Sequence, residues 1–228
     1  MSLKTIFLLI FVTLNGGLFS CGDLILGGKT EGYIEYEVSY PLPNESNLAE
    51  SMLPSTVSYY YKKGKTLTVI SAGMGVFTTR IFTDLESKKL TSALEISLMA
   101  KKVKTELTEE AINKQIDKER KMILQKTNDT LTIAGYLCHK AICIFPDSSL
   151  PNLDVYYTKE LKHESPNWYS PYRELDGVLM EFFIHRYGVH MKLRAKEVRK
   201  EKIEAEKFEL EDGFKSISQE EMDTYYKI

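Results

Sequence analysis

The sequence predicts a mainly β protein of the α+β class, built on a single curled antiparallel sheet. The 228 residues include 14 Tyr and 10 Phe beside one Trp, and most of these aromatics stand in alternating runs typical of half-buried strands. One amphipathic helix pattern falls inside the order of strands rather than at an end. We therefore expect a half-barrel of about ten strands, covered by one mid-chain helix and a short C-terminal helix. Two stacked sheets would also bury the apolar faces.

The first five strands are predicted from alternation. Ile34, Tyr36 and Val38 share one face of the first strand, and polar residues occupy the other face. The second strand and its return strand flank a hairpin turn at residues 62–65. The alternation stops at Lys101. The predicted strands cover residues 33–40, 57–61, 67–69, 76–83 and 90–98.

A helix is predicted over residues 108–119. Its apolar residues Ala111, Ile112 and Ile116 fall on one side of a helix. Thr108, followed by two glutamates, has the composition of a capped helix start, because a hydroxyl accepts from free amides there and carboxylates favour the positive end. The chain therefore carries one amphipathic helix in its middle.

The second half returns to strands and ends in a short helix. Residues 178–184 and 189–195 alternate on both sides of a Tyr-Gly turn and make the clearest hairpin of the sequence. Ser218 followed by Glu221 matches a capping box that opens a terminal helix through Tyr226. The predicted strands cover residues 122–124, 131–133, 137–145, 153–158, 178–184 and 189–195.

One face of this sheet is expected to line a hollow. A curled sheet of this size has more apolar face than one short helix covers, and leaving that face wet costs about 25 cal/mol per Å². An acyl-like ligand would remove that cost. Binding such a ligand requires no cofactor, and none is expected. A core filled by side chains would also remove the cost. The candidate lining residues are Ile34, Tyr36, Val38, Tyr59, Leu67, Val69, Met180, Phe182, Ile184 and Met191.

The loop at residues 163–172 is a further candidate. Pro166 and Pro171 stiffen it, and it carries three aromatic side chains, among them Trp168. Rigid amphipathic rings suit a lid over the mouth of an apolar hollow, so Trp168 joins the candidate ligand-binding residues. The other interpretation is a loop packed down on the sheet.

The first twenty residues have the pattern of an export signal. Lys4 precedes the apolar run 6–14, which at about 1.5 Å per residue is too short to cross a hydrocarbon core of about 30 Å. Leu18 and Ser20 precede Cys21 in an order that resembles the lipobox of bacterial prolipoproteins, whose cysteine is acylated. An ordinary signal with an incidental cysteine is the alternative. The predicted organisation is a signal peptide at 1–20, a lipidated tether at 21–29 and a single domain at 30–228.

The common catalytic motifs are absent from the sequence. It contains no G-x-S-x-G, phosphate-binding glycine loop, H-E-x-x-H or C-x-x-C, and its acidic pairs lie in charged segments, so we expect no enzyme activity. A formal net charge of −2 gives no basic footprint for a nucleic acid. His185 and His190 face each other across the predicted hairpin. We interpret them as surface residues and predict no metal site.

Cys138 and Cys143 are the other two cysteines. Because their spacing is odd, they project from opposite faces of one continuous strand. This favours two separate buried thiols that act as small hydrophobic residues. A disulfide would require a tight turn at residues 140–141.

Two segments of the second half resemble a known family. Residues 133–141 read Ile-Ala-Gly-Tyr-Leu-Cys-His-Lys-Ala and residues 155–161 read Val-Tyr-Tyr-Thr-Lys-Glu-Leu. With residues 195–198, they resemble the periplasmic lipoprotein-carrier superfamily of LolA and LppX type, and more closely its uncharacterised envelope lipoproteins. The resemblance implies a half-barrel whose helices cover a cavity for acyl chains or other lipids.

The lipid anchor distinguishes this chain from a soluble carrier of that superfamily. The expected location is the cell envelope, at the outer membrane and facing the periplasm, with the membrane itself as a partner through the N-terminal lipid. The expected function is to hold or present an apolar ligand. The alternative is a structural or interaction module of the envelope whose core is filled.

Overall fold

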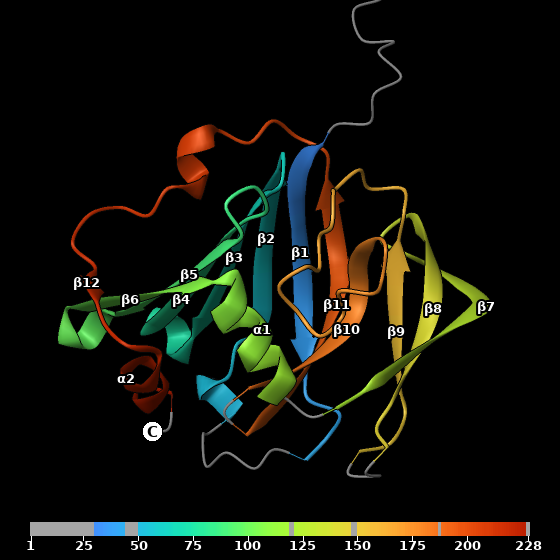
Figure 1. Ribbon diagram of the computed structural model, residues 1–228, viewed down its shortest axis with the longest axis horizontal. Coiled ribbons are helices and arrows are strands. Elements are labelled where there is room, and N and C mark those ends of the chain that lie inside the picture. Colours follow the sequence, from blue (N-terminus) through green and yellow to red (C-terminus); the bar gives the residue numbers. More distant parts are fainter. Residues whose placement is uncertain (1–29, 44–49, 119–120, 147–149, 187, 227–228) are drawn as a thin grey trace, which may run out of the picture.

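The computed structural model describes residues 30–43, 50–118, 121–146, 150–186 and 188–226. Their strands form one open sheet of twelve in the order β12-β6-β5-β4-β3-β2-β1-β11-β10-β9-β8-β7 (Figure 1). The first arm consists of β1 (Glu31–Ser39), β2 (Thr56–Lys62), β3 (Lys65–Ala72), β4 (Phe77–Asp84), β5 (Lys89–Ile96) and β6 (Lys101–Thr108). The remaining strands are β7 (Ile123–Ile133), β8 (Tyr136–Ile144), β9 (Leu153–Thr158), β10 (Val178–Arg186), β11 (Val189–Arg199) and β12 (Lys215–Ser216).

Two meanders meet at the centre of this sheet. Strands β1 to β6 pair with their sequence neighbours, strands β7 to β11 do the same, and β1 joins the two by pairing antiparallel with β11. Only the two-residue strand β12 is parallel to its neighbour, β6. In Figure 1, β1, β2 and β11 run upright while β5 and β6 run nearly across them, so the sheet is strongly twisted.

Three segments lie over one face of the sheet. Helix α1 (Glu109–Lys118) crosses in front of the central strands, the loop at residues 159–177 lies beside it, and α2 (Gln219–Thr224) packs near β6. The hydroxyl of Ser218 accepts a hydrogen bond from the amide of Glu221 at 3.0 Å, so the expected cap of the terminal helix is present. Both helices occur where the sequence predicts them.

The prediction of about ten strands is wrong, because the sheet has twelve. The sequence predicts no strand directly after Lys101, where the alternation stops, yet residues 101–108 form β6, in which Val103 and Thr105 are buried. The amine of Lys102 lies 2.9 Å from the carboxylate of Glu211. Strand β12 is too short to leave an alternating pattern. The strand predicted to run to residue 98 ends at Ile96, where the 3₁₀ turn Ser97–Met99 begins.

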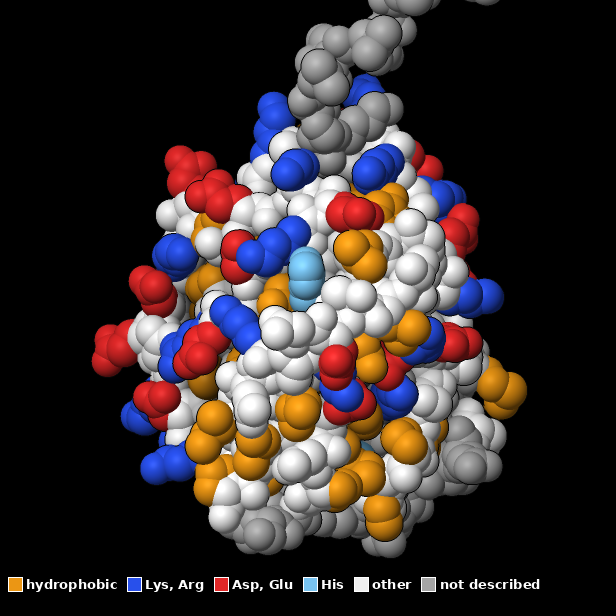
Figure 2. All heavy atoms as spheres, turned by 90° about the vertical axis from the view of Figure 1, so that its right-hand side faces the viewer, with side chains coloured by type: hydrophobic (Ala, Val, Ile, Leu, Met, Phe, Trp, Pro, Cys, Tyr) orange, Lys and Arg blue, Asp and Glu red, His pale blue; other side chains and the backbone are white. Residues whose placement is uncertain are grey.

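Strand β7 joins two segments that were predicted separately. Its pairing with β8 shifts between Lys126 and Thr130, so the polar residues between them form an irregularity rather than a turn. The strand lies at the edge of the sheet. Figure 2 shows this side of the molecule, where Lys and Arg are interspersed with Asp and Glu. Such charges and irregularities discourage edge-to-edge pairing with another chain.

Candidate ligand cavity

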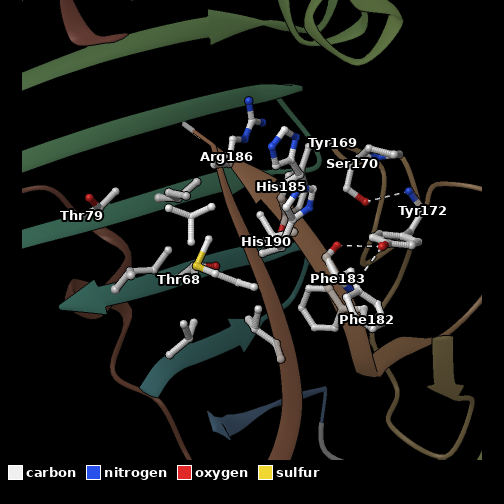
Figure 3. Close-up of a pocket in the computed structure, with 18 of the residues that line it drawn as sticks. Thr68, Thr79, Tyr169, Ser170, Tyr172, Phe182, Phe183, His185, Arg186 and His190 are labelled. Atoms are coloured by element: carbon white, nitrogen blue, oxygen red, sulfur yellow. Dashed lines mark hydrogen bonds between the residues drawn. The ribbon is translucent and has the colours of Figure 1, made fainter. Parts of the chain in front are cut away.

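A cavity of about 790 Å³ lies between the sheet and its cover. Its walls come from strands on both arms of the sheet and from α1, α2 and the 159–177 loop, and most of its lining side chains are aliphatic or aromatic. Figure 3 shows the part near the β10–β11 hairpin, with Phe182 and Phe183 on β10 and Thr68 and Thr79 on the opposite wall. A volume of this order is typical of small-molecule sites.

The first-arm wall is set by the turn between β2 and β3. Only Lys63 and Gly64 lie between the paired residues Lys62 and Lys65, and both have positive φ, 46° and 79°, as a two-residue hairpin with matching twist requires. Across such a turn, odd positions on β2 face even positions on β3. Thr68 and Ile70 therefore stand beside Tyr59 and Val57 and line the cavity.

The expectation that Leu67 and Val69 share the face of Tyr59 does not hold. It took the apolar alternation of β3 as the mark of the cavity face, whereas the hairpin pairs Tyr59 with Thr68, so that Thr68 and Ile70 stand on that face. Leu67 pairs with Tyr60 on the outer face, where the segment Ala205–Phe208 contacts β3. Leu67 is buried there, and neither Leu67 nor Val69 lines the cavity.

The 159–177 loop is closed on itself by a buried amide. The side-chain nitrogen of Asn167 donates to the carbonyls of Leu175 at 2.8 Å and Gly177 at 2.9 Å. At the exposed side, the guanidinium of Arg173 donates to the side-chain oxygen of Asn113 on α1 at 2.9 Å. The loop and the helix therefore form one continuous cover.

The tyrosines of the cavity wall turn their hydroxyls to the protein. Tyr36 donates to the carbonyl of Leu179 at 2.8 Å and Tyr172 donates to the carbonyl of Phe183 at 2.7 Å. Burial raises the pKa of Tyr36 well above its usual value, as it also does for Tyr59. These phenols stay neutral, and they present ring carbons to the cavity.

A filled part of the same face adjoins the cavity. We define the packed region as the buried residues Ile34, Tyr61, Ile133, Cys138, Leu161, Met180 and Ala195, which share a core with the cavity wall but do not line the cavity. His163 covers it, since its ring stacks on Tyr61 at 5.3 Å and on Tyr59 at 6.3 Å. Its Nε2 lies 3.1 Å from the Tyr59 hydroxyl. Burial lowers the pKa of His163 to about 4, so this imidazole is neutral at pH 7.

The mouth of the cavity is polar. Lys118, His185 and Arg186 are the only exposed side chains among its described lining residues. His185 on β10 is paired with His190 on β11, and their rings stack at 4.1 Å with 13° between the planes. His190 lies on the inner side of this stack and is buried.

Five of the eleven predicted ligand-binding residues line the cavity: Tyr36, Tyr59, Phe182, Ile184 and Met191. Ile34 and Met180 lie in the packed region, and Val38 packs at the edge of the same core. Met180 is the extra residue at an irregularity between β10 and β9. Trp168 does not line the cavity, and the amine of Lys88 lies 5.0 Å from its ring, while its neighbour Tyr169 lines the cavity.

Several lining residues were not predicted. Thr68 and Ile70 would have followed from a two-residue turn at Lys63-Gly64. His190 was assigned to the surface, and its inward position follows from the cross-strand stack. Tyr172 and Tyr226 belong to segments whose sequence carries no alternation, so only tertiary packing brings them to the cavity.

The remaining candidates are placed as follows. Cys21, the signal peptide and the tether lie outside the described residues. Cys138 and Cys143 are free and buried in different clusters, as their odd spacing predicts. Burial raises their pKa values to about 11 and about 12, so both remain thiols.

The described residues contain neither a metal-binding cluster nor a membrane-spanning helix. No group of three or more His, Cys, Asp or Glu side chains in this part of the chain could hold a metal ion. Of the helices in the same residues, none has the length and hydrophobicity needed to cross a membrane.

Comparison with known proteins gives a likeness of fold. No family model and no curated protein matches the chain. Among solved structures, it is similar to one described as PNGF-II in the C2 space group, with a TM-score of 0.53 and 17% sequence identity. The match covers 86% of this chain and 32% of that chain, so this chain spans about a third of that protein's length. At this identity the similarity concerns the fold alone.

Proposed function

We propose that this protein is a membrane-anchored envelope lipoprotein that binds or presents a hydrophobic ligand and catalyses no reaction. The observation that carries the proposal is the cavity of about 790 Å³ with its mainly apolar lining. Apolar surface that is left exposed to water costs about 25 cal/mol per Å². A lipid or acyl chain removes that cost, and the inward rings of Tyr36 and Phe182 offer it apolar contacts.

The proposed architecture is a half-barrel curled around this ligand. Residues of β3, β4 and β5 and residues of β10 and β11 line one cavity, although several strands separate them in the sheet. This arrangement supports the proposed likeness to carriers of LolA and LppX type. The segments that carry that resemblance, residues 133–141 and 155–161, fall on the β7–β8 hairpin and on β9 with the loop that follows.

The proposed anchor is a lipid on Cys21, preceded by a cleaved signal. We expect labelled palmitate to be incorporated into the wild-type chain and to be lost from Cys21→Ala, whose precursor should stay uncleaved by the lipoprotein signal peptidase. Cys138→Ala is the matched control and should keep the label. Palmitate incorporation into Cys21→Ala would place the anchor elsewhere.

Ligand binding is tested by filling the cavity without opening the core. Ile70 lines the cavity. Val69, the residue before it on β3, faces the opposite side of the sheet. In protein stripped of lipid, Ile70→Trp should weaken binding of a fluorescent fatty-acid probe at least about tenfold, which corresponds to about 1.4 kcal/mol. Val69→Trp should bind as wild type does. Circular dichroism must show an intact sheet in both variants.

Absence of saturable probe binding by the wild-type protein would contradict the proposal. The alternative, a structural or interaction module of the envelope, would then replace it, and the packed region gives that alternative some support. Mass spectrometry of lipids extracted from the purified mature protein provides an independent measurement. A reproducible lipid at equimolar amount is the expected result.

A further inference from the structure

The described charged residues that line the cavity all have the same sign. Lys118 and Arg186 line it, and the described lining residues include no Asp or Glu, although the whole chain has 32 acids and a formal net charge of −2. The buried acid on β10, Glu181, does not line the cavity. Its carboxylate lies 2.6 Å from the amine of Lys192 and is also bound by Arg194. Among the described lining residues, the formal charges are therefore all positive.

Polar side chains of the lining are concentrated at the mouth. Arg186 and His185 are consecutive at the end of β10 and both are exposed, whereas the lining residues farther along this strand, such as Ile184 and Phe182, are half-buried and apolar. Figure 3 shows Arg186 and the two histidines together at one end of the strand pair, across from Tyr169 and Ser170 of the loop. The cavity thus has a polar end and an apolar body.

The groups at the polar end are hydrogen-bond donors suited to an anion. A guanidinium has five N–H donors in a planar fork that matches a carboxylate or a phosphate, and an imidazole also has an N–H donor. The stack of His185 on His190 holds the two rings 4.1 Å apart, which fixes their orientation before a ligand arrives. Such preorganisation reduces the cost of binding.

We propose that the ligand is a long-chain anionic amphiphile whose carboxylate or phosphate head is bound by Arg186, His185 and His190 at the mouth. Its acyl chain lies in the apolar body, beside Ile184 and Phe182. This inference rests on the proposed ligand-binding function and specifies the ligand's chemistry. A neutral head would forgo the charge-assisted hydrogen bonds, and a cationic head would meet Lys118 and Arg186.

The test compares four compounds with the same C16 chain in competition with the fluorescent fatty-acid probe. Palmitate and hexadecyl phosphate should bind the stripped wild-type protein at least about tenfold more tightly than hexadecanol, and hexadecyltrimethylammonium should be the weakest. The tighter of the two anions identifies the head group. If hexadecanol equals both anions, this inference is wrong and the proposed function stands. If none of the four competes, the proposed function itself fails.

Two variants assign the preference to the mouth. Arg186→Gln should reduce the preference for palmitate over hexadecanol from about tenfold to under about threefold, while hexadecanol binding stays unchanged. Arg199→Gln removes the same charge from the end of β11, outside the cavity lining, and should keep the full preference. An undiminished preference in Arg186→Gln, or an equal loss in Arg199→Gln, would overturn the assignment.

Discussion

The packed region and the cavity are two parts of one core on the same sheet, and they differ in what covers them. Over the packed region, the 159–177 loop supplies large side chains, with Leu161 buried in the core and His163 stacked on Tyr59 and Tyr61. Over the cavity, the later part of the same loop contributes Tyr169 and Tyr172, and α1 contributes mainly Ile112 and Ile116, but these side chains leave a void. Tyr59 lines the cavity, and its ring stacks on Tyr61 of the packed region, so it lies at the boundary. The difference teaches that the cover, rather than the sheet, decides where this protein is hollow.

The largest expected effect compares two methionines. Met180 is fully buried in the packed region, whereas Met191 lines the cavity. Met180→Ala should lower the free energy of unfolding by about 2–5 kcal/mol, because the neighbours cannot close the new void. Met191→Ala should cost less than half of this, since its side chain already borders empty space. Urea denaturation of the stripped protein measures both, and equal losses would mean that the two parts are equally filled.

A second effect is the pH dependence of stability, which His163 introduces over the packed region only. The pKa of His163 is depressed from about 6.5 to about 4 because burial disfavours the imidazolium. Between these values the unfolded chain binds more protons than the folded one. The stabilisation from the neutral ring is therefore complete above pH 6.5 and is lost as the pH falls toward 4. We expect it to amount to about 2 kcal/mol, less than the full shift implies because the ring is half-buried.

His163→Phe isolates this effect. The variant keeps a flat ring against Tyr61 but has nothing to protonate, so its free energy of unfolding should fall less between pH 7 and pH 4 than that of the wild type. Urea denaturation at several pH values measures the difference, in which the contributions of the carboxylates cancel. Parallel curves for the two proteins would show that His163 is protonated equally in the folded and unfolded chains.

The smallest expected effect concerns the contact between α1 and the 159–177 loop, the two segments that cover the sheet. The hydrogen bond from Arg173 to Asn113 is exposed, so Arg173→Ala should change the free energy of unfolding by less than about 1 kcal/mol. It should nevertheless free α1 from the loop and speed hydrogen exchange at the amides of Ile112 and Ile116. Arg199→Ala, outside the cavity, is the control. Unchanged exchange in Arg173→Ala would show that the helix is held by its apolar contacts alone.

Local patterns in the sequence are sufficient for the classes and positions of most elements. Strand alternation places β1, β10 and β11 because side chains project to alternate faces whatever the surroundings. The cap at Ser218 and the helix after Thr108 depend only on neighbouring backbone amides and carboxylates. The odd spacing of Cys138 and Cys143 likewise separates the two thiols on a continuous strand.

Other features depend on contacts between distant segments, and only the tertiary structure decides them. The lysines of β6 interrupt the apolar alternation, and a partner of one of them, Glu211, is far along the chain. Leu67 of β3 is buried on the outer face of the sheet, where the segment Ala205–Phe208, far along the chain, contacts β3. His190 becomes a cavity residue because β10 and β11 hold two rings in register. The void itself exists because α1 and the loop cover unequal parts of one apolar surface, and such a balance of volumes leaves no periodic signal in the sequence.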